Sequence, residues 1–238
     1  MGIFMTLFSL GERLALCASM VRPGTALADV GTDHAYLPVW LAKQGLIAAA
    51  VASDVRSGPL ERAKRNIEKY GVGHIVNARL SDGLDAILPE EADDVVIAGM
   101  GGLMIAEIVR RAAWLKNGGK RLILQPMTRE EDLRRSLAEE GFFIVREQAA
   151  QEEHRVYTAM LCAYGTDGRP QNELFPYIGL LTSETPASRA YLRRERKRLL
   201  KRANGLKAQG DEGRALELFR IRERIGAMLP PEEPESEE

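Results

Sequence analysis

Apolar and polar positions alternate along the chain in blocks that predict strands and helices in turn. Short apolar runs with the length of buried strands cover residues 26–30, 48–54, 75–80, 94–98 and 121–126. Between them, apolar residues recur every three or four positions, which is the spacing of an amphipathic helix. This alternation predicts an α/β fold of the Rossmann-like kind, with a parallel sheet whose carboxyl edge binds the ligand.

The helices of this pattern are bounded by recognisable end signals. Gly45 is expected to end one helix, and Thr128 with Glu131 has the spacing of a capping box that begins another. Two later apolar runs, residues 142–145 and 154–164, predict a hairpin that closes the sheet. The predicted helices cover residues 10–21, 37–44, 59–70, 102–115 and 128–140.

A second unit is predicted after residue 166. Thr185 and Pro186 form an N-cap and first-turn pair. Apolar residues at helical spacing on both sides of residues 209–211 predict an α-helical, coiled-coil-like hairpin. The chain is thus expected to divide into a domain at 1–166, a helical hairpin at 167–230 and a disordered acidic tail at 231–238.

The charge of individual segments is more informative about binding partners than the net charge of the chain. The formal net charge is −1, so no global basic field indicates a nucleic-acid partner. The first arm of the predicted hairpin, however, carries one acid, Glu195, against Arg189, Arg193, Arg194, Arg196, Lys197, Arg198, Lys201, Arg202 and Lys207. Such a one-sided helix predicts contacts with nucleic-acid phosphates. The expected contacts are Arg193, Arg194, Lys197 and Lys201.

Other residue types narrow the class of protein. Cys17 and Cys162 are far apart and form no C-x-x-C pair, which is typical of a reducing cytosol, so a cytoplasmic protein is expected. No stretch has the composition of a membrane span, and the three histidines share no ligand spacing, so neither a membrane nor a metal is expected. A monomer is slightly favoured.

The loop within residues 27–38 carries the strongest chemical signal. Asp29 lies in the first predicted strand, Gly31 breaks it, and Asp33 stands where a dinucleotide-binding loop needs a glycine against the pyrophosphate. A carboxylate there repels a pyrophosphate but suits the ammonium and sulfonium of S-adenosylmethionine. Asp33 has a simpler alternative role, which is to cap the following helix.

Acids at the ends of the next two strands fit the rest of this cofactor. Asp54 is expected to bind ribose hydroxyls, and Asp82 to accept a hydrogen bond from the adenine amino group with Gly83 beside the base. A helix cap and a turn are their alternatives. Glycines within residues 99–102 leave bare backbone for ligands. The expected cofactor site comprises Asp29, Gly31, Thr32, Asp33, Asp54, Val55, Asp82, Gly83, Ala98, Gly99 and Met100.

Three segments together carry a family resemblance: residues 29–38 (DVGTDHAYLP), 98–102 (AGMGG) and 124–127 (LQPM). They resemble the class I S-adenosylmethionine-dependent methyltransferases and, more narrowly, the bacterial tRNA (adenine-N1)-methyltransferase family called TrmK. The resemblance implies methylation at N1 of adenine 22 in tRNA. It also implies a methyltransferase domain followed by a helical hairpin, and a cofactor pocket that includes Gly31, Asp33, Asp54, Asp82 and the Gly99 turn.

A reaction at adenine N1 assigns roles to further residues. Tyr36, Met100 and Met127 are candidates to hold a flipped-out base, and Gln125 lies at a strand end where a substrate enters. Asp33 is the first candidate to stabilise the cationic product or accept a proton from N6.

Two substrate assignments have a simpler alternative. His34 is a second candidate proton acceptor, but it is equally consistent with a backbone hydrogen bond. Arg13 is a candidate phosphate contact on the first helix, although a single arginine on such a helix is commonly just solvated.

Two other functions each account for part of the sequence. An NAD-dependent oxidoreductase on a Rossmann fold accounts for Asp54 but not for Asp33. A non-catalytic tRNA-binding protein accounts for the basic hairpin alone. Binding of S-adenosylmethionine, of NAD or of neither would distinguish the methyltransferase from these two alternatives.

Overall fold

The computed structural model describes residues 7–165 and 172–231. The linker predicted at residues 167–170 and almost all of the tail predicted at 231–238 lie outside the described residues. Among the described residues, no helix is both long and apolar enough to cross a membrane.

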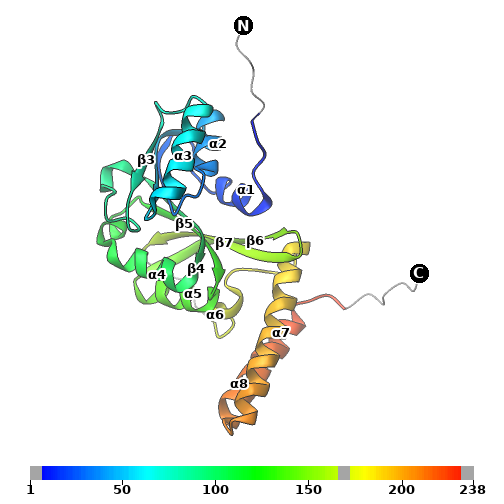
Figure 1. The fold of residues 1–238 in the computed structure, drawn as a ribbon. Coiled ribbons are helices and arrows are strands. Elements are labelled where there is room, and N and C mark those ends of the chain that lie inside the picture. Colours follow the sequence, from blue (N-terminus) through cyan, green and yellow to red (C-terminus); the bar gives the residue numbers. More distant parts are fainter. Residues whose placement is uncertain (1–6, 166–171, 232–238) are drawn as a thin grey trace, which may run out of the picture.

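One mixed sheet forms the centre of the chain, in the strand order β3-β2-β1-β4-β5-β7-β6 (Figure 1). The first five strands are parallel, β7 runs antiparallel to β5, and β6 pairs antiparallel with β7. The strands are β1 (Thr25–Val30), β2 (Ile47–Asp54), β3 (Val76–Leu80), β4 (Asp94–Gly101), β5 (Arg121–Thr128), β6 (Phe142–Glu152) and β7 (Arg155–Tyr164). The predicted Rossmann-like sheet and its closing hairpin are confirmed.

Helices cover both faces of this sheet. The helices are α1 (Glu12–Ala18), α2 (Tyr36–Lys43), α3 (Ser57–Lys69), α4 (Gly102–Arg111), α5 (Glu130–Glu139), α6 (Phe175–Ile178), α7 (Pro186–Ala208) and α8 (Glu212–Ala227). One hydrophobic cluster joins α1, α2 and α3 to one face, and another joins α4 and α5 to the opposite face. Because side chains alternate along a strand, Val96 enters the first cluster while its neighbours Val95 and Ile97 enter the second.

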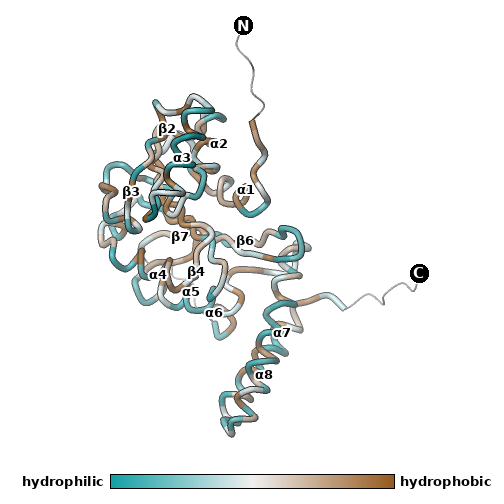
Figure 2. The backbone as a smooth tube through the Cα atoms, in the orientation of Figure 1, coloured by the Kyte–Doolittle hydropathy of each residue, from teal (hydrophilic) through white to brown (hydrophobic). Residues whose placement is uncertain are grey.

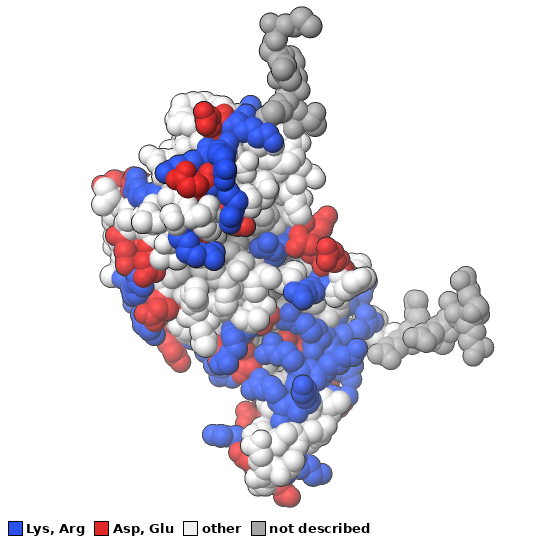
Figure 3. Space-filling view, viewed as in Figure 1, with Lys and Arg blue, Asp and Glu red and all other residues white. Residues whose placement is uncertain are grey.

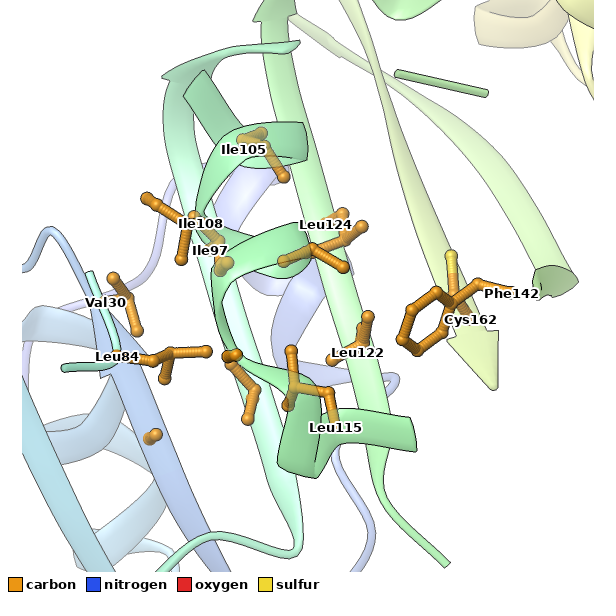
Figure 4. Packing of buried hydrophobic residues seen from close by; sticks show 14 of the residues in the cluster. Val30, Leu84, Ile97, Ile105, Ile108, Leu115, Leu122, Leu124, Phe142 and Cys162 are labelled. Atoms are coloured by element: carbon orange, nitrogen blue, oxygen red, sulfur yellow. The ribbon is translucent and has the colours of Figure 1, made fainter. Parts of the chain in front are cut away.

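The second cluster holds β4 and β5 in place beneath α4. Figure 4 shows Ile97 and Leu124 of the strands beside Ile105 and Ile108 of the helix. Three of these side chains are fully buried, and Ile108 is 6% exposed. Burial of each contributes roughly 1.5–3 kcal/mol to folding, so the start of α4 is firmly fixed against the sheet.

Two predicted helix boundaries are wrong. The helix expected to reach residue 115 ends at Arg111, because Ala112 leaves the helical conformation and a short 3₁₀ turn, Ala113–Lys116, follows. The capping box at Thr128 does not form. Thr128 instead extends β5 by pairing with Gly101, and the helix begins only after Arg129, which adopts φ = 60°.

The predicted C-terminal helical hairpin is confirmed. Figures 1 and 2 show α7 and α8 side by side, extending away from the sheet, with hydrophilic and hydrophobic residues alternating along both helices. The Thr185 hydroxyl caps α7 by accepting a hydrogen bond from the Ser188 backbone N–H at 3.0 Å. The buried seam between the helices contains Leu192, Leu199, Ala203, Leu218, Ile221 and Ile225.

A buried ion pair connects this hairpin to the sheet. Arg134 on α5 is 1% exposed and lies 2.7 Å from the Glu147 carboxylate on β6. The same guanidinium donates hydrogen bonds to the carbonyls of Pro176 and Tyr177 and to the Tyr191 hydroxyl of α7, at 2.9–3.0 Å. Arg134 therefore joins α5, β6, the α6 segment and α7 at a single point.

Glu147 has its remaining acceptor positions occupied as well. Its carboxylate accepts hydrogen bonds from the Thr158 hydroxyl at 2.8 Å and the Leu180 backbone N–H at 3.0 Å. Gly179 packs directly against the pair, with φ = 58°, and a Cβ there would lie 1.7 Å from the Glu147 carboxylate. Only glycine fits this turn.

Candidate functional site

A cavity of about 540 Å³ opens at the carboxyl ends of the parallel strands. This is where open α/β sheets bind ligands, because loops from neighbouring strands diverge there. Eight of the residues predicted to bind a cofactor line this cavity, namely Gly31, Asp54, Val55, Asp82, Gly83, Ala98, Gly99 and Met100. The sequence positions converge in space although they come from four different strand ends.

The two cavity-lining acids predicted to bind the cofactor have different surroundings. Asp54, at the end of β2, is 5% exposed and accepts a hydrogen bond from the Arg56 backbone N–H at 2.8 Å. Asp82 is exposed and lies 3.3 Å from the guanidinium of Arg111 on α4. A buried carboxylate with remaining acceptor capacity suits ligand hydroxyls, whereas the Asp82 carboxylate exchanges its partners with solvent.

Gly31 makes the close approach of the first loop possible. It has φ = 77°, and both its backbone N–H and that of Thr32 donate to the Ser53 carbonyl at 2.8 Å. A Cβ at this position would lie 2.0 Å from the terminal methyl of Met100. The bare backbone therefore lets the β1 and β4 loops meet at the wall of the cavity.

Asp29 and Thr32 belong to the support of this loop and do not line the cavity. The Thr32 hydroxyl accepts a hydrogen bond from the Ala35 backbone N–H at 3.0 Å, which shapes the turn into α2. Asp29 is 6% exposed, and burial raises the pKa of its carboxyl to about 6, although a hydrogen bond from Thr32 opposes the shift. The ionised form of such a buried carboxyl becomes more favourable when a cation approaches.

The raised pKa of Asp29 gives a test of the loop. Above pH 6 the folded state carries a penalised charge, so Asp29→Asn should raise the free energy of unfolding of the ligand-free protein by about 3 kcal/mol. The gain should shrink as pH falls through 6 and vanish below about 4, where the carboxyl is protonated in both states. Denaturant unfolding at pH 4, 5, 6 and 8 measures it. A gain that is independent of pH would contradict the assignment.

Asp33, His34 and Tyr36 lie together beside the cavity but do not line it. The exposed Asp33 carboxylate pairs with Arg62 of α3 at 2.5 Å and with the His34 imidazole at 3.3 Å. The hydrogen bond from Arg62 holds the pKa of Asp33 below its usual range. The His34 ring stacks on Tyr36 with ring centroids 5.0 Å apart, and the His34 carbonyl accepts a hydrogen bond from Asn66.

Arg13 and Gln125 interact with each other in the structure. Gln125 is fully buried, and its side-chain oxygen accepts hydrogen bonds from Arg13 at 2.8 Å and from the Gly99 backbone N–H at 3.1 Å. Its amide nitrogen donates to the Pro126 carbonyl. The structure therefore gives both side chains a supporting role, in which they fix the Gly99 turn at the wall of the cavity.

The remaining predicted substrate residues lie toward the helical hairpin. Met127 lines a second cavity, of about 700 Å³, together with Arg193, Arg194 and Lys197 of α7. Lys201 is exposed one turn farther along the same helix. Figure 3 shows lysine and arginine side chains gathered over this part of the molecule.

The cations of α7 form two adjacent stripes at helical spacing. Those of the inner stripe are held by α5: Arg194 and Arg198 pair with Glu130 at 2.6 and 3.2 Å, and Arg202 pairs with Glu131 at 2.6 Å. Those of the outer stripe are Arg193, Lys197 and Lys201. Within the described part of the chain, no carboxylate pairs with the outer stripe, so its three cations are free to bind an anion.

Comparison with known proteins places this geometry in a family. Residues 10–160 match a family model described as a methyltransferase domain. Over 156 residues the chain is 35% identical to the tRNA (adenine(22)-N(1))-methyltransferase of Bacillus subtilis, and the alignment spans 66% of each chain. The crystal structure of the B. subtilis m1A22 tRNA methyltransferase TrmK superposes with a TM-score of 0.81 at 27% identity, covering 93% of this chain and 99% of that one. The chain belongs to the TrmK family.

A Streptococcus pneumoniae relative adds a bound ligand to the comparison. Its crystal structure in complex with S-adenosyl-L-methionine is 31% identical, with a TM-score of 0.80, and covers 91% of this chain and 99% of that one. The TrmK fold of this chain, including its C-terminal helices, is thus shared over nearly its whole length.

Sequence reasoning missed the α4 side of the TrmK site. Met104, Ile108 and Arg111 line the 540 Å³ cavity, and Arg111 pairs with both Asp82 and Asp85. The available signal was the amphipathic helix directly after the glycine-rich turn, whose first residues must face the same cavity. No group of three or more potential metal ligands occurs within the residues that the structure describes.

Proposed function

We propose that this protein is an S-adenosylmethionine-dependent tRNA methyltransferase that acts on N1 of adenine 22. The observation that carries the proposal is the convergence of eight predicted cofactor residues on one cavity, in a chain whose S. pneumoniae relative was solved with S-adenosyl-L-methionine. The B. subtilis relative supplies the substrate, because it is named for adenine 22 of tRNA. Action in the cytoplasm as a monomer, by a domain at 1–166 and a helical hairpin at 167–230, belongs to the same proposal.

The residues of the cavity fit this cofactor group by group. We expect Asp54 to accept hydrogen bonds from ribose hydroxyls, and Asp82 to accept one from the adenine amino group. Asp29 beneath the loop favours the ammonium end, since a nearby cation stabilises its ionised form. When bound, S-adenosylmethionine supplies an electrophilic methyl group on its sulfonium.

Catalysis by this chain consists mainly of positioning. Adenine N1 already carries an in-plane lone pair, so it needs alignment more than a strong base. The Gln125 side chain holds the Gly99 turn through its backbone N–H, and Met100 offers an apolar contact to an unstacked base. Tyr36 and the outer stripe of α7 are proposed to contact the rest of the tRNA.

Asp33 is proposed to stabilise the cationic product or to accept a proton from N6, with His34 as the second acceptor. Its carboxylate is exposed beside the Gly31 loop, and Arg62 keeps it ionised. The Asp33 carboxylate and the His34 imidazole lie 3.3 Å apart, so the two candidate acceptors stand side by side. An ionised carboxylate near the methylated base stabilises the positive charge that develops there.

The cofactor assignment predicts the behaviour of one substitution. Asp54→Asn should weaken S-adenosylmethionine binding about tenfold, since a buried acceptor is replaced by a group that is also a donor. The affinity for tRNA should stay within twofold. Calorimetric titration with S-adenosylmethionine, with NAD and with tRNA measures each affinity.

The same titration separates the rival functions. Binding of NAD but not S-adenosylmethionine would indicate an oxidoreductase. A protein that binds tRNA but neither S-adenosylmethionine nor NAD would be a non-catalytic tRNA-binding protein. Equal loss of cofactor and tRNA affinity in Asp54→Asn would contradict separate sites for the two ligands.

A further inference from the structure

The 700 Å³ cavity has an apolar floor and a cationic rim. Val156 of β7 is buried, and it forms the floor together with Ala190 of α7, which packs against it in one hydrophobic cluster. The rim carries Arg155 from β7 and the residues Arg193, Arg194 and Lys197 from α7. No acidic side chain lines it among the residues that the structure describes. An apolar surface surrounded by positive charge fits a nucleotide, whose base is flat and apolar and whose phosphates are anionic.

This cavity is adjacent to the cofactor cavity but distinct from it. Thr128 lines the 700 Å³ cavity and pairs in register with Gly101, which lines the 540 Å³ cofactor cavity. A Cβ on Gly101 would lie 3.5 Å from the Thr128 hydroxyl, so the two strand ends form the wall between the cavities. They have no lining residue in common. A base that reaches the cofactor cavity therefore lies outside the 700 Å³ cavity, which leaves that cavity for another nucleotide of the RNA chain.

The rim also continues toward the rest of the hairpin. Arg193 and Lys197 line a further hollow of about 380 Å³ with Arg196 and with Arg222 of α8. Two hollows that share two cations form one basic path along α7. Such a path follows a polynucleotide backbone rather than a single free phosphate.

We propose that the cavity between the β6–β7 turn and α7 binds the nucleotide next to the target adenosine. Its base lies on Val156 and Ala190, and its phosphates contact Arg193 and Lys197. This inference rests on the proposed function for the identity of the RNA. It adds a second base-binding site, which holds the RNA strand while the target base is presented to the cofactor.

Filling the cavity without changing charge tests the proposal. Ala190→Trp and, from the opposite wall, Gln151→Trp should each weaken tRNA binding about tenfold, which is the loss expected for one stacked base. Asn204→Trp, exposed on the same helix outside the cavity, is the matched control and should bind tRNA like the wild type. S-adenosylmethionine affinity should be unchanged in all three. Thermal unfolding shows whether each variant is folded. Because two different variants fill the cavity, the test can still be made if one of them does not fold.

The RNA supplies the second half of the test. In wild-type protein, an abasic nucleotide on one side of the target adenosine should also cost about tenfold in affinity. In the filled variants the same abasic RNA should cost nothing further, since the cavity is already lost. Normal tRNA binding by both folded variants, or an abasic penalty that persists in them, would overturn the proposal. Affinities are measured without cofactor, so a wild type that binds tRNA but forms no 1-methyladenosine would count against the proposed function alone.

Discussion

Arg134→Met is expected to lower the free energy of unfolding by about 3–5 kcal/mol. The substitution leaves the Glu147 carboxylate buried without its cation, and breaking a buried pair from one side costs about this much. It also removes the hydrogen bonds that Arg134 donates to the α6 segment and to Tyr191 of α7. Denaturant unfolding measures the change. Because these contacts span α5, β6 and α7, the helical hairpin should also become more accessible to proteases.

Arg135→Met is the matched control for this experiment. Arg135 lies on the same helix, but it is exposed and forms a 3.4 Å pair with Glu131, so its loss should cost less than about 1 kcal/mol. The double variant Arg134→Met with Glu147→Leu should recover part of the loss, since it removes both charges together. Equal effects of Arg134→Met and Arg135→Met would show that the buried pair does not hold the hairpin in place.

Reversing the outer stripe of α7 is expected to weaken tRNA binding roughly a hundredfold. The variant replaces Arg193, Lys197 and Lys201 by Glu, and these three cations have no carboxylate partner in the described part of the chain. Each lost phosphate contact should also reduce the slope of log affinity against log salt by about one. Fluorescence anisotropy with labelled tRNA at several salt concentrations measures both quantities. Affinity for S-adenosylmethionine should not change.

Two further triple variants make the result specific. Reversal of Lys207, Arg214 and Arg220, exposed cations elsewhere on α7 and α8, changes net charge equally and should cost less than threefold in tRNA affinity. Replacement of the inner stripe, Arg194, Arg198 and Arg202, by methionine should lower stability, because Glu130 is almost fully buried against it. An outer stripe that behaves like the Lys207 set would restrict the hairpin to a structural role.

The two stripes show how far charge can be read from sequence. Helical spacing alone correctly predicted a basic arm with Glu195 as its one acid. It did not reveal that Glu130 and Glu131, more than sixty residues earlier, lie against half of the arginines. Pairing between distant segments depends on how α5 and α7 pack. Arg194 is held within the protein, because its guanidinium also donates to the Val156 carbonyl and lies over the Tyr191 ring, and its contact with tRNA stays a prediction.

The cofactor cavity was more predictable than the substrate side for a related reason. Asp54, Asp82 and Gly99 stand at strand ends, and the parallel order of the strands brings their ends to one edge of the sheet. Gln125 also stands at a strand end, yet its side chain points into protein and fixes the Gly99 turn. Position along a strand predicts which edge a residue reaches, but the hydrogen-bond partners that determine its role come from other elements.

Helix ends were the least predictable part of the fold. Thr128 and Glu131 have capping-box spacing, but the pairing of Thr128 with Gly101 keeps Thr128 in the strand. A ladder contact between β4 and β5 thus overrides a local signal. The same contact forms the wall between the two cavities, so the boundary that sequence reasoning missed is one on which the site depends.

Nucleoside analysis of methylated tRNA directly tests whether this protein methylates N1 of adenine 22. The protein is incubated with S-adenosylmethionine and unmodified tRNA that contains adenine 22, and the digested nucleosides are compared by mass spectrometry with standards of 1-methyladenosine and its isomers. The proposed function predicts 1-methyladenosine with the wild type, much less with Asp54→Asn at low cofactor concentration, and none with tRNA in which adenine 22 is replaced by another base. A different methylated nucleoside, or no methylation of tRNA by protein that binds S-adenosylmethionine, would contradict it.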